Sequence, residues 1–197
     1  PPYIKRSPND KSQGIYDDER YQTIYAEKMG AIAAPTAGLH FTTNLLQEIS
    51  RKGIKIVYIT LHVGLGTFKP IHTEDLRQHT IHKEFYNIPE ETTDTINKAK
   101  SLGKKIFATG TSTCRVLETI AKNNTTEKSS GWTNLFIYPP YKFKLTDSLI
   151  TNFHLQRSTL ILLASAFAGR ENIATSYKEA ISLNYRFYSY GDCMLIL

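Results

Sequence analysis

Histidines are the side chains of this sequence best suited to proton transfer near neutral pH, and they occur in different settings. His79 and His82 are three residues apart, which suits one helical face or a pair in a loop. A metal site would need at least one further ligand nearby, and the sequence holds no HExxH segment or carboxylate triad, so we predict none. His40 and His154 each stand next to a phenylalanine. That setting fits either a core histidine or a general base beside an apolar wall.

A glycine-containing segment, LHVGLGTFKPI, follows an apolar run that is typical of a strand. Gly64 and Gly66 fit the start of a dinucleotide-binding fingerprint. Lys69 stands where the third glycine is needed, and Pro70 would block the helix that must follow, so we reject this interpretation. Two alternatives stay open. The segment is a sheet-end turn with a hydrogen-bonded His62, or a turn whose backbone closely approaches a bound group.

The segment TGTSTCR joins a predicted strand to a predicted helix. Its glycine and hydroxyl residues place free backbone amides at a helix start, and Arg115 adds a fixed positive charge. Such a helix start favours phosphate or carboxylate. Simple capping of the helix by Ser112 or Thr113 is the other interpretation, and the sequence does not separate the two.

Near the C-terminus, YRFYSYGDCM alternates aromatic side chains, Tyr190 among them, with Arg186 and Asp192. Aromatic rings interleaved with arginine can stack on RNA bases. A buried strand with alternating aromatic residues accounts for the rings equally well. The two charged residues resist that second interpretation, because buried charges need partners.

The elements that must position these residues follow from the spacing of apolar side chains. Helices are predicted over residues 18–30, 42–52, 89–103, 111–122, 158–169 and 171–185. Strands are predicted over residues 54–63, 104–110, 135–138 and 148–153, with a closing strand pair over 185–197. Because helix and strand alternate at least three times, we predict an α/β domain with a layered, mixed sheet flanked by helices. The segments LHVGLGTF, TGTSTCR and TNFH all follow strands, where ligands of such domains bind.

The composition is that of a folded, basic chain. With 197 residues, of which 41% are hydrophobic, it can bury a sizeable core. A formal net charge of +6 fits a polyanionic partner such as RNA, although many basic proteins bind no nucleic acid. Cys114 and Cys193 provide neither zinc spacing nor a disulfide framework, so we expect a cytoplasmic protein. The longest apolar run, Thr159–Ala168, is about half of a bilayer span, so we predict no membrane partner.

Four separated segments together resemble one family, the S-adenosylmethionine:tRNA ribosyltransferase-isomerases of queuosine biosynthesis. They are RYQTIYAEKMGAIAAPTAGLHFT, TLHVGLGTFKPI, TNFHLQRSTLILLASAFAG and YRFYSYGDCMLI, with support from ATGTSTCRVLE and LFIYPPYKF. The departures are modest. Pro140 stands where the family commonly has glycine, Gln156 and Arg157 replace a usual Pro-Lys pair, and hydroxyls precede Arg115 in a slightly different order.

The resemblance implies the family's main α/β domain without its inserted β-barrel domain. Residues 1–20 would be a connector returning from an N-terminal portion that includes the barrel, and residues 21–197 would be the α/β catalytic domain. The implied reaction transfers and isomerises the ribosyl group of S-adenosylmethionine onto the aminomethyl group of 7-aminomethyl-7-deazaguanine at the tRNA wobble position. Epoxyqueuosine forms, and adenine and methionine leave. S-adenosylmethionine is a substrate, so no cofactor is expected, and we expect a monomer.

This chemistry needs a base for the acceptor amine or the sulfonium-activated carbon, and an acid for the departing adenine. The resemblance implies His40 or His154 as the general base and His62 as the acid or a substrate-orienting group. Asp192 would orient a histidine or bind the amine. Thr111, Ser112 and Arg115 would hold the methionine carboxylate or a tRNA phosphate. The complete predicted substrate-binding set is Gly64, Gly66, Thr67, Thr111, Ser112, Arg115, Arg157, Arg186 and Tyr190.

Two other functions compete with this one. A non-catalytic tRNA-binding fragment would bind tRNA and release no adenine. A methyltransferase is disfavoured, because the sequence lacks the glycine-rich first-strand motif of that class.

Overall fold

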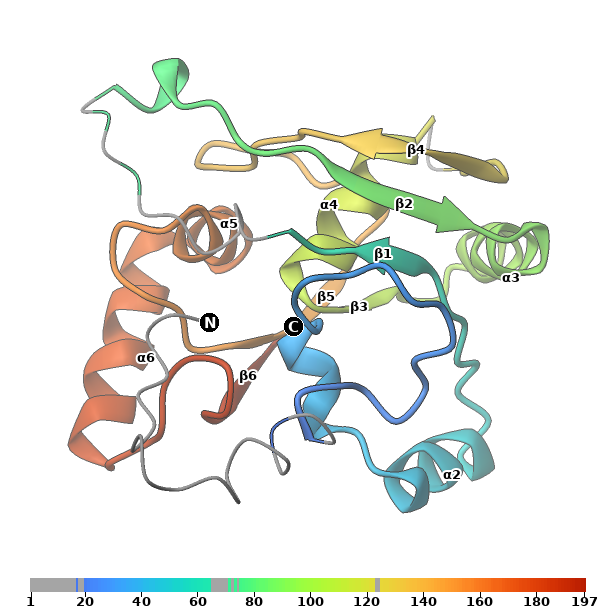
Figure 1. Cartoon of the computed structure of the whole chain (residues 1–197), viewed down its shortest axis with the longest axis horizontal. Coiled ribbons are helices and arrows are strands. Elements are labelled where there is room, and N and C mark those ends of the chain that lie inside the picture. Colours follow the sequence, from blue (N-terminus) through green and yellow to red (C-terminus); the bar gives the residue numbers. More distant parts are fainter. Residues whose placement is uncertain (1–16, 18–19, 65–70, 72, 74, 123–124) are drawn as a thin grey trace.

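The computed structural model describes residues 17, 20–64, 71, 73, 75–122 and 125–197 (Figure 1). Their elements are η1 (Thr36–His40), α2 (Thr43–Arg51), β1 (Thr60–His62), η3 (Leu76–Gln78), β2 (Glu84–Ile88), α3 (Glu90–Ser101), β3 (Phe107–Thr109), α4 (Thr111–Ile120), β4 (Ser129–Thr133), β5 (Ser148–Asn152), α5 (Thr159–Ala168), α6 (Arg170–Ser182) and β6 (Cys193–Ile196). None of the described helices is long and apolar enough to cross a membrane.

The described strands form two sheets of three strands each. One is antiparallel, in the order β1-β2-β4, and the other is mixed, in the order β3-β5-β6, with β3 parallel to β5 and β6 antiparallel to it. Helix α4 lies between the sheets and contacts β3, β4 and β5 (Figure 1). The predicted α/β class and its mixed sheet are confirmed, although the strands divide into two sheets where one was expected.

The core is built around α4. Cys114, Val116 and Leu117 of this helix are buried together with Leu149 of β5 and Leu163 of α5. Fully burying an aliphatic side chain of this size contributes about 1.5–3 kcal/mol. The segment that leads into β5 is tied to the same helix, because the Glu118 carboxylate accepts three consecutive backbone N–H groups, those of residues 144–146.

Several predicted elements are confirmed in place: α2, α3, β3, α4, β5, α5 and α6. The predicted helix over residues 18–30 is wrong, because residues 21–30 form bends and turns. There the Tyr25 ring packs against Tyr58 and its hydroxyl lies close to Gly38. Strands β2 and β4 were not predicted, and no strand forms over residues 135–138, although Ile137 is buried in the core.

Two predicted strands are much shorter than expected. Of residues 54–63, only Thr60–His62 pair with a neighbouring strand. Of residues 185–197, only Cys193–Ile196 form a strand, while residues 186–192 make a loop that returns the chain to β5. This loop brings Arg186 and Asp192 to the end of the mixed sheet.

Candidate active site

The carboxyl ends of the parallel strands β3 and β5 meet η1 and the loop of residues 186–192. Gly110 ends β3, and its N–H donates to the Ile150 carbonyl oxygen at 2.8 Å. Its φ of 93° is a left-handed conformation that glycine adopts without strain, and it lets α4 begin at once. The methyl group of Ala37, in η1, lies opposite Gly110. This is the edge of an α/β sheet at which ligands bind.

Asn152, the last residue of β5, is the polar centre of this edge. Its side chain is 2% exposed. The Nδ2 amide lies 3.1 Å from the Tyr188 carbonyl oxygen, 3.2 Å from His40 Nε2 and 3.5 Å from the Gly191 carbonyl oxygen. Oδ1 is buried and has no hydrogen-bond partner within the described part of the chain. Sequence reasoning did not single out Asn152, although it belongs to the TNFH segment noted there.

His40, the last residue of η1, is half-buried beside that amide. Burial lowers the pKa of His40 below its ordinary value of 6.5, and the positive charge of Arg186 acts in the same direction. The negative charge of Asp192 opposes both, so the carboxylate lies near enough to act on the ring. The structure therefore brings together three predicted site residues, His40, Arg186 and Asp192.

The Asp192 carboxylate stabilises the loop of residues 186–192 through hydrogen bonds to Arg186. Its Oδ2 accepts the backbone N–H of Arg186 at 2.7 Å, and its Oδ1 accepts from the Arg186 guanidinium at 3.0 Å. These hydrogen bonds lower the pKa of Asp192, so the group is a carboxylate at neutral pH. The loop also needs Gly191, since a Cβ there would lie 2.4–2.5 Å from backbone atoms of residues 186 and 187.

His154 has hydrogen-bond partners other than His40 and Asn152. It is buried, its Nε2 lies 2.7 Å from Thr151 Oγ1, and its backbone N–H donates to the Tyr177 hydroxyl at 2.7 Å. Burial lowers the pKa of His154 from 6.5 to about 3. Burial and the lowered pKa fit a neutral core histidine, and the role of His154 as the general base stays a prediction.

Arg115 lies in α4 and is almost fully buried. It is 3% exposed. One Nη1 donates to Glu84 Oε2 at 2.7 Å, and Nε donates to the Leu135 carbonyl oxygen at 2.9 Å. Its charge is paired with a buried carboxylate, while Nη2 is buried and has no hydrogen-bond partner among the described residues. The binding of a substrate carboxylate or a tRNA phosphate by Arg115 stays a prediction.

The start of α4 lacks the predicted side-chain cap but is still suited to the predicted anion binding. Gly110 is the N-cap and makes no side-chain hydrogen bond, so the proposed capping by Ser112 or Thr113 is not observed. Thr111 and Ser112 are buried in the first turn. The amides of residues 111–113 have no acceptor among the residues that the structure describes. Anion binding by Thr111 and Ser112 stays a prediction that this geometry permits.

His62 and the glycine-containing segment are partly described. The centre of the His62 ring lies 5.2 Å from that of Phe85, with the two rings tilted by 42°, and the ring lies so close to Gly30 that a side chain there would collide with it. Its Nε2 is buried and has no hydrogen-bond partner in the described ranges. Gly64 is half-buried and follows β1, whereas Gly66 and Thr67 lie outside the described residues. The roles of His62 and Gly64 stay predictions.

Arg157 and Tyr190 lie at the rim of the mixed sheet. Arg157 is exposed, and its carbonyl oxygen accepts the N–H of Ile71 at 2.8 Å, which joins the two segments that follow β1 and β5. The Tyr190 hydroxyl donates to Asp17 at 3.0 Å, and its ring meets Tyr21 edge-on. A free Arg157 side chain is compatible with its predicted substrate role, whereas the Tyr190 hydroxyl is already engaged.

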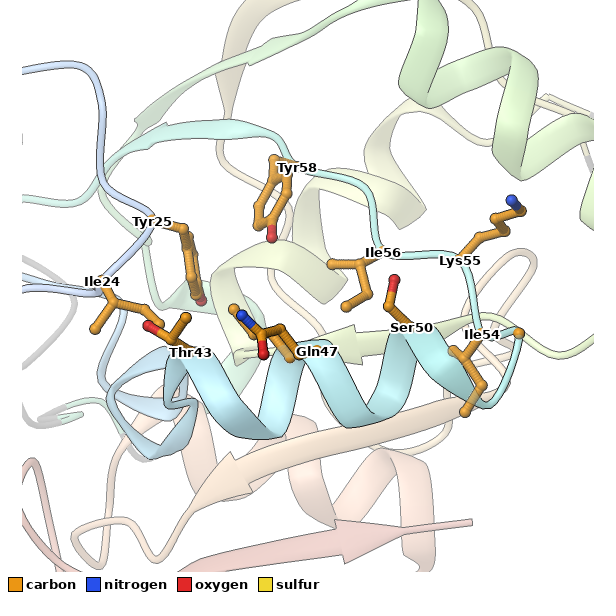
Figure 2. Close-up of a pocket in the computed structure, with 11 residues that line it drawn as sticks. Ile24, Tyr25, Thr43, Gln47, Ser50, Ile54, Lys55, Ile56 and Tyr58 are labelled. Carbon is orange, nitrogen blue, oxygen red and sulfur yellow. The ribbon is translucent and has the colours of Figure 1, made fainter.

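A separate groove of about 530 Å³ runs between α2 and residues 53–58 (Figure 2). Figure 2 shows the rings of Tyr25 and Tyr58 pointing toward α2, which presents Gln47 and Ser50. Burial, together with the neighbouring Tyr58, raises the pKa of Tyr25 to about 12. No predicted site residue lines this groove. In the described ranges, no three His, Cys, Asp or Glu side chains are grouped so that they could hold a metal ion.

A half-buried histidine held by an amide and lying near a carboxylate, at the carboxyl ends of strands in an α/β fold, is typical of an enzyme active site. The class of protein is thus an α/β fold with a candidate active site around His40. Residues 1–196 match the family described as Queuosine biosynthesis protein, and the chain belongs to that family.

Curated relatives and a solved structure agree with this assignment. The chain is 55% identical over 197 residues to the S-adenosylmethionine:tRNA ribosyltransferase-isomerase of Acetivibrio thermocellus and 53% identical to that of Sulfurihydrogenibium sp.. All of the chain is matched, but it spans 56% of the length of each relative. The crystal structure of S-adenosylmethionine tRNA ribosyltransferase from Thermotoga maritima is similar, with 45% identity and a TM-score of 0.69 over 82% of this chain and 51% of that one.

Proposed function

We propose that this chain forms the α/β catalytic part of an S-adenosylmethionine:tRNA ribosyltransferase-isomerase. The reaction moves and isomerises the ribosyl group of S-adenosylmethionine onto the aminomethyl group of 7-aminomethyl-7-deazaguanine in tRNA, and it releases adenine and methionine. The enzyme acts as a cytoplasmic monomer and consumes S-adenosylmethionine as a substrate, without a cofactor. The observation that carries the proposal is the His40–Asn152–Asp192 arrangement at the sheet edge, in a chain more than half identical to enzymes of that name.

Each residue of the candidate site has a separate role in this proposal. His40 faces the substrate from η1, and Asp192 with Arg186 forms the charged wall beside it. The amides in the first turn of α4 have no acceptor in the described part of the chain, and with Thr111 and Ser112 they suit the methionine carboxylate, because a helix start favours an anion. His62 ends β1 and Arg157 follows β5, and the Ile71–Arg157 hydrogen bond joins the segments that follow these two strands. These two residues orient the substrate or its tRNA.

The test uses the full-length protein, S-adenosylmethionine and tRNA that carries 7-aminomethyl-7-deazaguanine. Nucleosides are digested and analysed by mass spectrometry, and free adenine is measured in parallel. Epoxyqueuosine together with adenine is expected. In the variant His40→Ala both products should fall by about 100-fold or more, while the matched control His82→Ala, an exposed histidine, keeps its rate. Bound tRNA without adenine release would instead favour a tRNA-binding protein, and methylated tRNA would favour a methyltransferase.

A further inference from the structure

The orientation of the Asn152 amide is fixed by its surroundings. Two backbone carbonyl oxygens, those of Tyr188 and Gly191, lie 3.1 and 3.5 Å from one end of the amide. Carbonyl oxygens only accept hydrogen bonds, so the end that faces them must be the NH₂ group. The oxygen end, Oδ1, then points the other way and has no partner among the described residues.

This orientation determines where the proton of His40 resides. The same NH₂ group lies 3.2 Å from His40 Nε2. An amide nitrogen carries hydrogens and no available lone pair, so it can only donate to that ring atom. Nε2 must therefore be the bare, accepting nitrogen, and the single ring proton resides on Nδ1. A ring protonated on both nitrogens would set two N–H groups against each other.

The surroundings of His40 favour the same form. Burial has the largest effect on the pKa of His40 and lowers it, Asp192 raises it, and the smaller effect of Arg186 lowers it again. Asp192 is the group that could stabilise a positively charged ring, but both of its oxygens already accept hydrogen bonds from Arg186. The pKa of His40 stays below its ordinary value of 6.5, chiefly through burial, so the ring is uncharged at neutral pH.

We propose that Asn152 is a positioning residue that holds His40 as a neutral imidazole protonated on Nδ1, so that His40 donates a hydrogen bond to the substrate. The inference rests on the proposed function and revises the sequence hypothesis that His40 is a general base. A base needs a free lone pair, and the only lone pair of this ring is taken by Asn152. A neutral imidazole N–H stabilises an atom that gains electron density. The departing adenine is such a group, because it takes the electron pair of its bond to the ribosyl carbon.

The first test reads the ring itself and needs no activity. The full-length protein is labelled with ¹⁵N-histidine, and long-range ¹H–¹⁵N spectra are recorded from pH 8 to pH 5, with His40→Gln to identify the His40 signals. We expect a proton on Nδ1, a bare Nε2, and titration below the ordinary pKa of 6.5. A His40 ring protonated on Nε2 in the unaltered protein would overturn the proposal.

The second test links the ring to the reaction. Asn152→Asp keeps the shape of the side chain but accepts a hydrogen bond, so the ring proton should move to Nε2 and the pKa of His40 should rise. The rate of adenine release should fall by about 100-fold. The KM for S-adenosylmethionine should change by less than about threefold, because the binding site is unaltered. Asn134→Asp, at an exposed asparagine, is the matched control.

The outcomes separate this inference from the function on which it rests. A relocated proton with an unchanged rate of adenine release would refute the donor role of His40. An unaltered protein that shows the Nδ1 proton but releases no adenine would refute the proposed function, and with it any role of His40 in that reaction. The ring measurement stands even if Asn152→Asp fails to fold, because it is made on the unaltered protein.

Discussion

At the scale of single residues, the buried ion pair between Arg115 and Glu84 connects α4 to β2. The two side chains are 3% and 2% exposed. Replacing Arg115 by Met would remove the Arg115 cation from beside the buried Glu84 carboxylate, which costs about 3–5 kcal/mol of unfolding free energy. Urea unfolding of the full-length protein measures this loss. The double variant Arg115→Met, Glu84→Met should recover much of it, since both charges of this buried pair are then removed.

The same pair distinguishes a structural role from a binding role. If Arg115 held a substrate anion, Arg115→Met would raise the KM for S-adenosylmethionine or tRNA while the urea midpoint stayed in place. We expect the reverse: a lower midpoint, and a KM close to that of the unaltered protein wherever the variant is folded.

His154 gives the protein a pH-dependent stability. Burial holds the pKa of His154 at about 3 in the folded protein, against 6.5 ordinarily. Below pH 6.5 the unfolded chain binds a proton at His154 that the folded chain does not bind. The contribution of His154 to the free energy of unfolding is therefore complete above pH 6.5 and declines as the pH falls toward 3. At pH 5 the loss is about 2 kcal/mol. Urea unfolding at pH 7 and pH 5 should show it.

A comparison of variants isolates the contribution of this histidine from the carboxylates that titrate in the same range. His154→Gln should lower stability at pH 7 and flatten the difference between pH 7 and pH 5 by about 2 kcal/mol. His82→Gln, which replaces an exposed ring, should leave that difference unchanged. An equal pH dependence in all three proteins would mean that His154 titrates alike in the folded and unfolded chains.

At the scale of elements, the loop of residues 186–192 depends on Gly191. A Cβ at this position would meet backbone atoms at 2.4–2.5 Å, and backbone cannot move aside as a flexible side chain can. Gly191→Ala should therefore open the loop and break the hydrogen bonds that the Tyr188 and Asp192 amides donate to Phe153 and Arg186. Hydrogen exchange at these two amides should accelerate by about tenfold or more, as expected for local opening.

The control for that loop is Gly53→Ala. Gly53 also has a positive φ, of 79°, but nothing lies within 4 Å of the position that a Cβ would take. This variant should cost about 1 kcal/mol through backbone strain alone and leave the loop amides unchanged. Equal effects of the two substitutions on loop exchange would show that close packing at Gly191 is not what shapes the loop.

Elements whose pattern is local could be predicted from the sequence. The helix α3 has a proline and acids at its start and lysines near its end, and α2 is followed by a glycine with positive φ. Both were therefore recognised. The strand predicted over residues 54–63 failed because a strand exists only where a neighbour accepts its hydrogen bonds. Among the described residues, β2 pairs with residues 60–62 alone.

The types of residue in the candidate site could be predicted from the sequence, but the side-chain contacts that these residues make could not. His40, Arg186 and Asp192 stand in segments that chemistry alone made notable, and the structure brings them together. The partner of Arg115 is 31 positions away in a strand that the sequence did not reveal, so its burial could not be foreseen. Asn152 is separated from His40 by 112 positions, and no local pattern encodes such a contact.

At the scale of the whole molecule, the net charge of +6 sets the expected response of tRNA binding to salt. Lysine and arginine side chains that contact phosphates release bound cations, so affinity falls as the salt concentration rises. With about three such contacts, the affinity for tRNA should fall by roughly twentyfold between 50 and 200 mM KCl. Fluorescence anisotropy of labelled tRNA with the full-length protein measures the slope of log affinity against log salt concentration. Arg157→Ala should reduce this slope by about one unit, the contribution of one phosphate contact. A salt-independent affinity would contradict phosphate recognition, and an unchanged slope in Arg157→Ala would remove this exposed side chain from the tRNA surface.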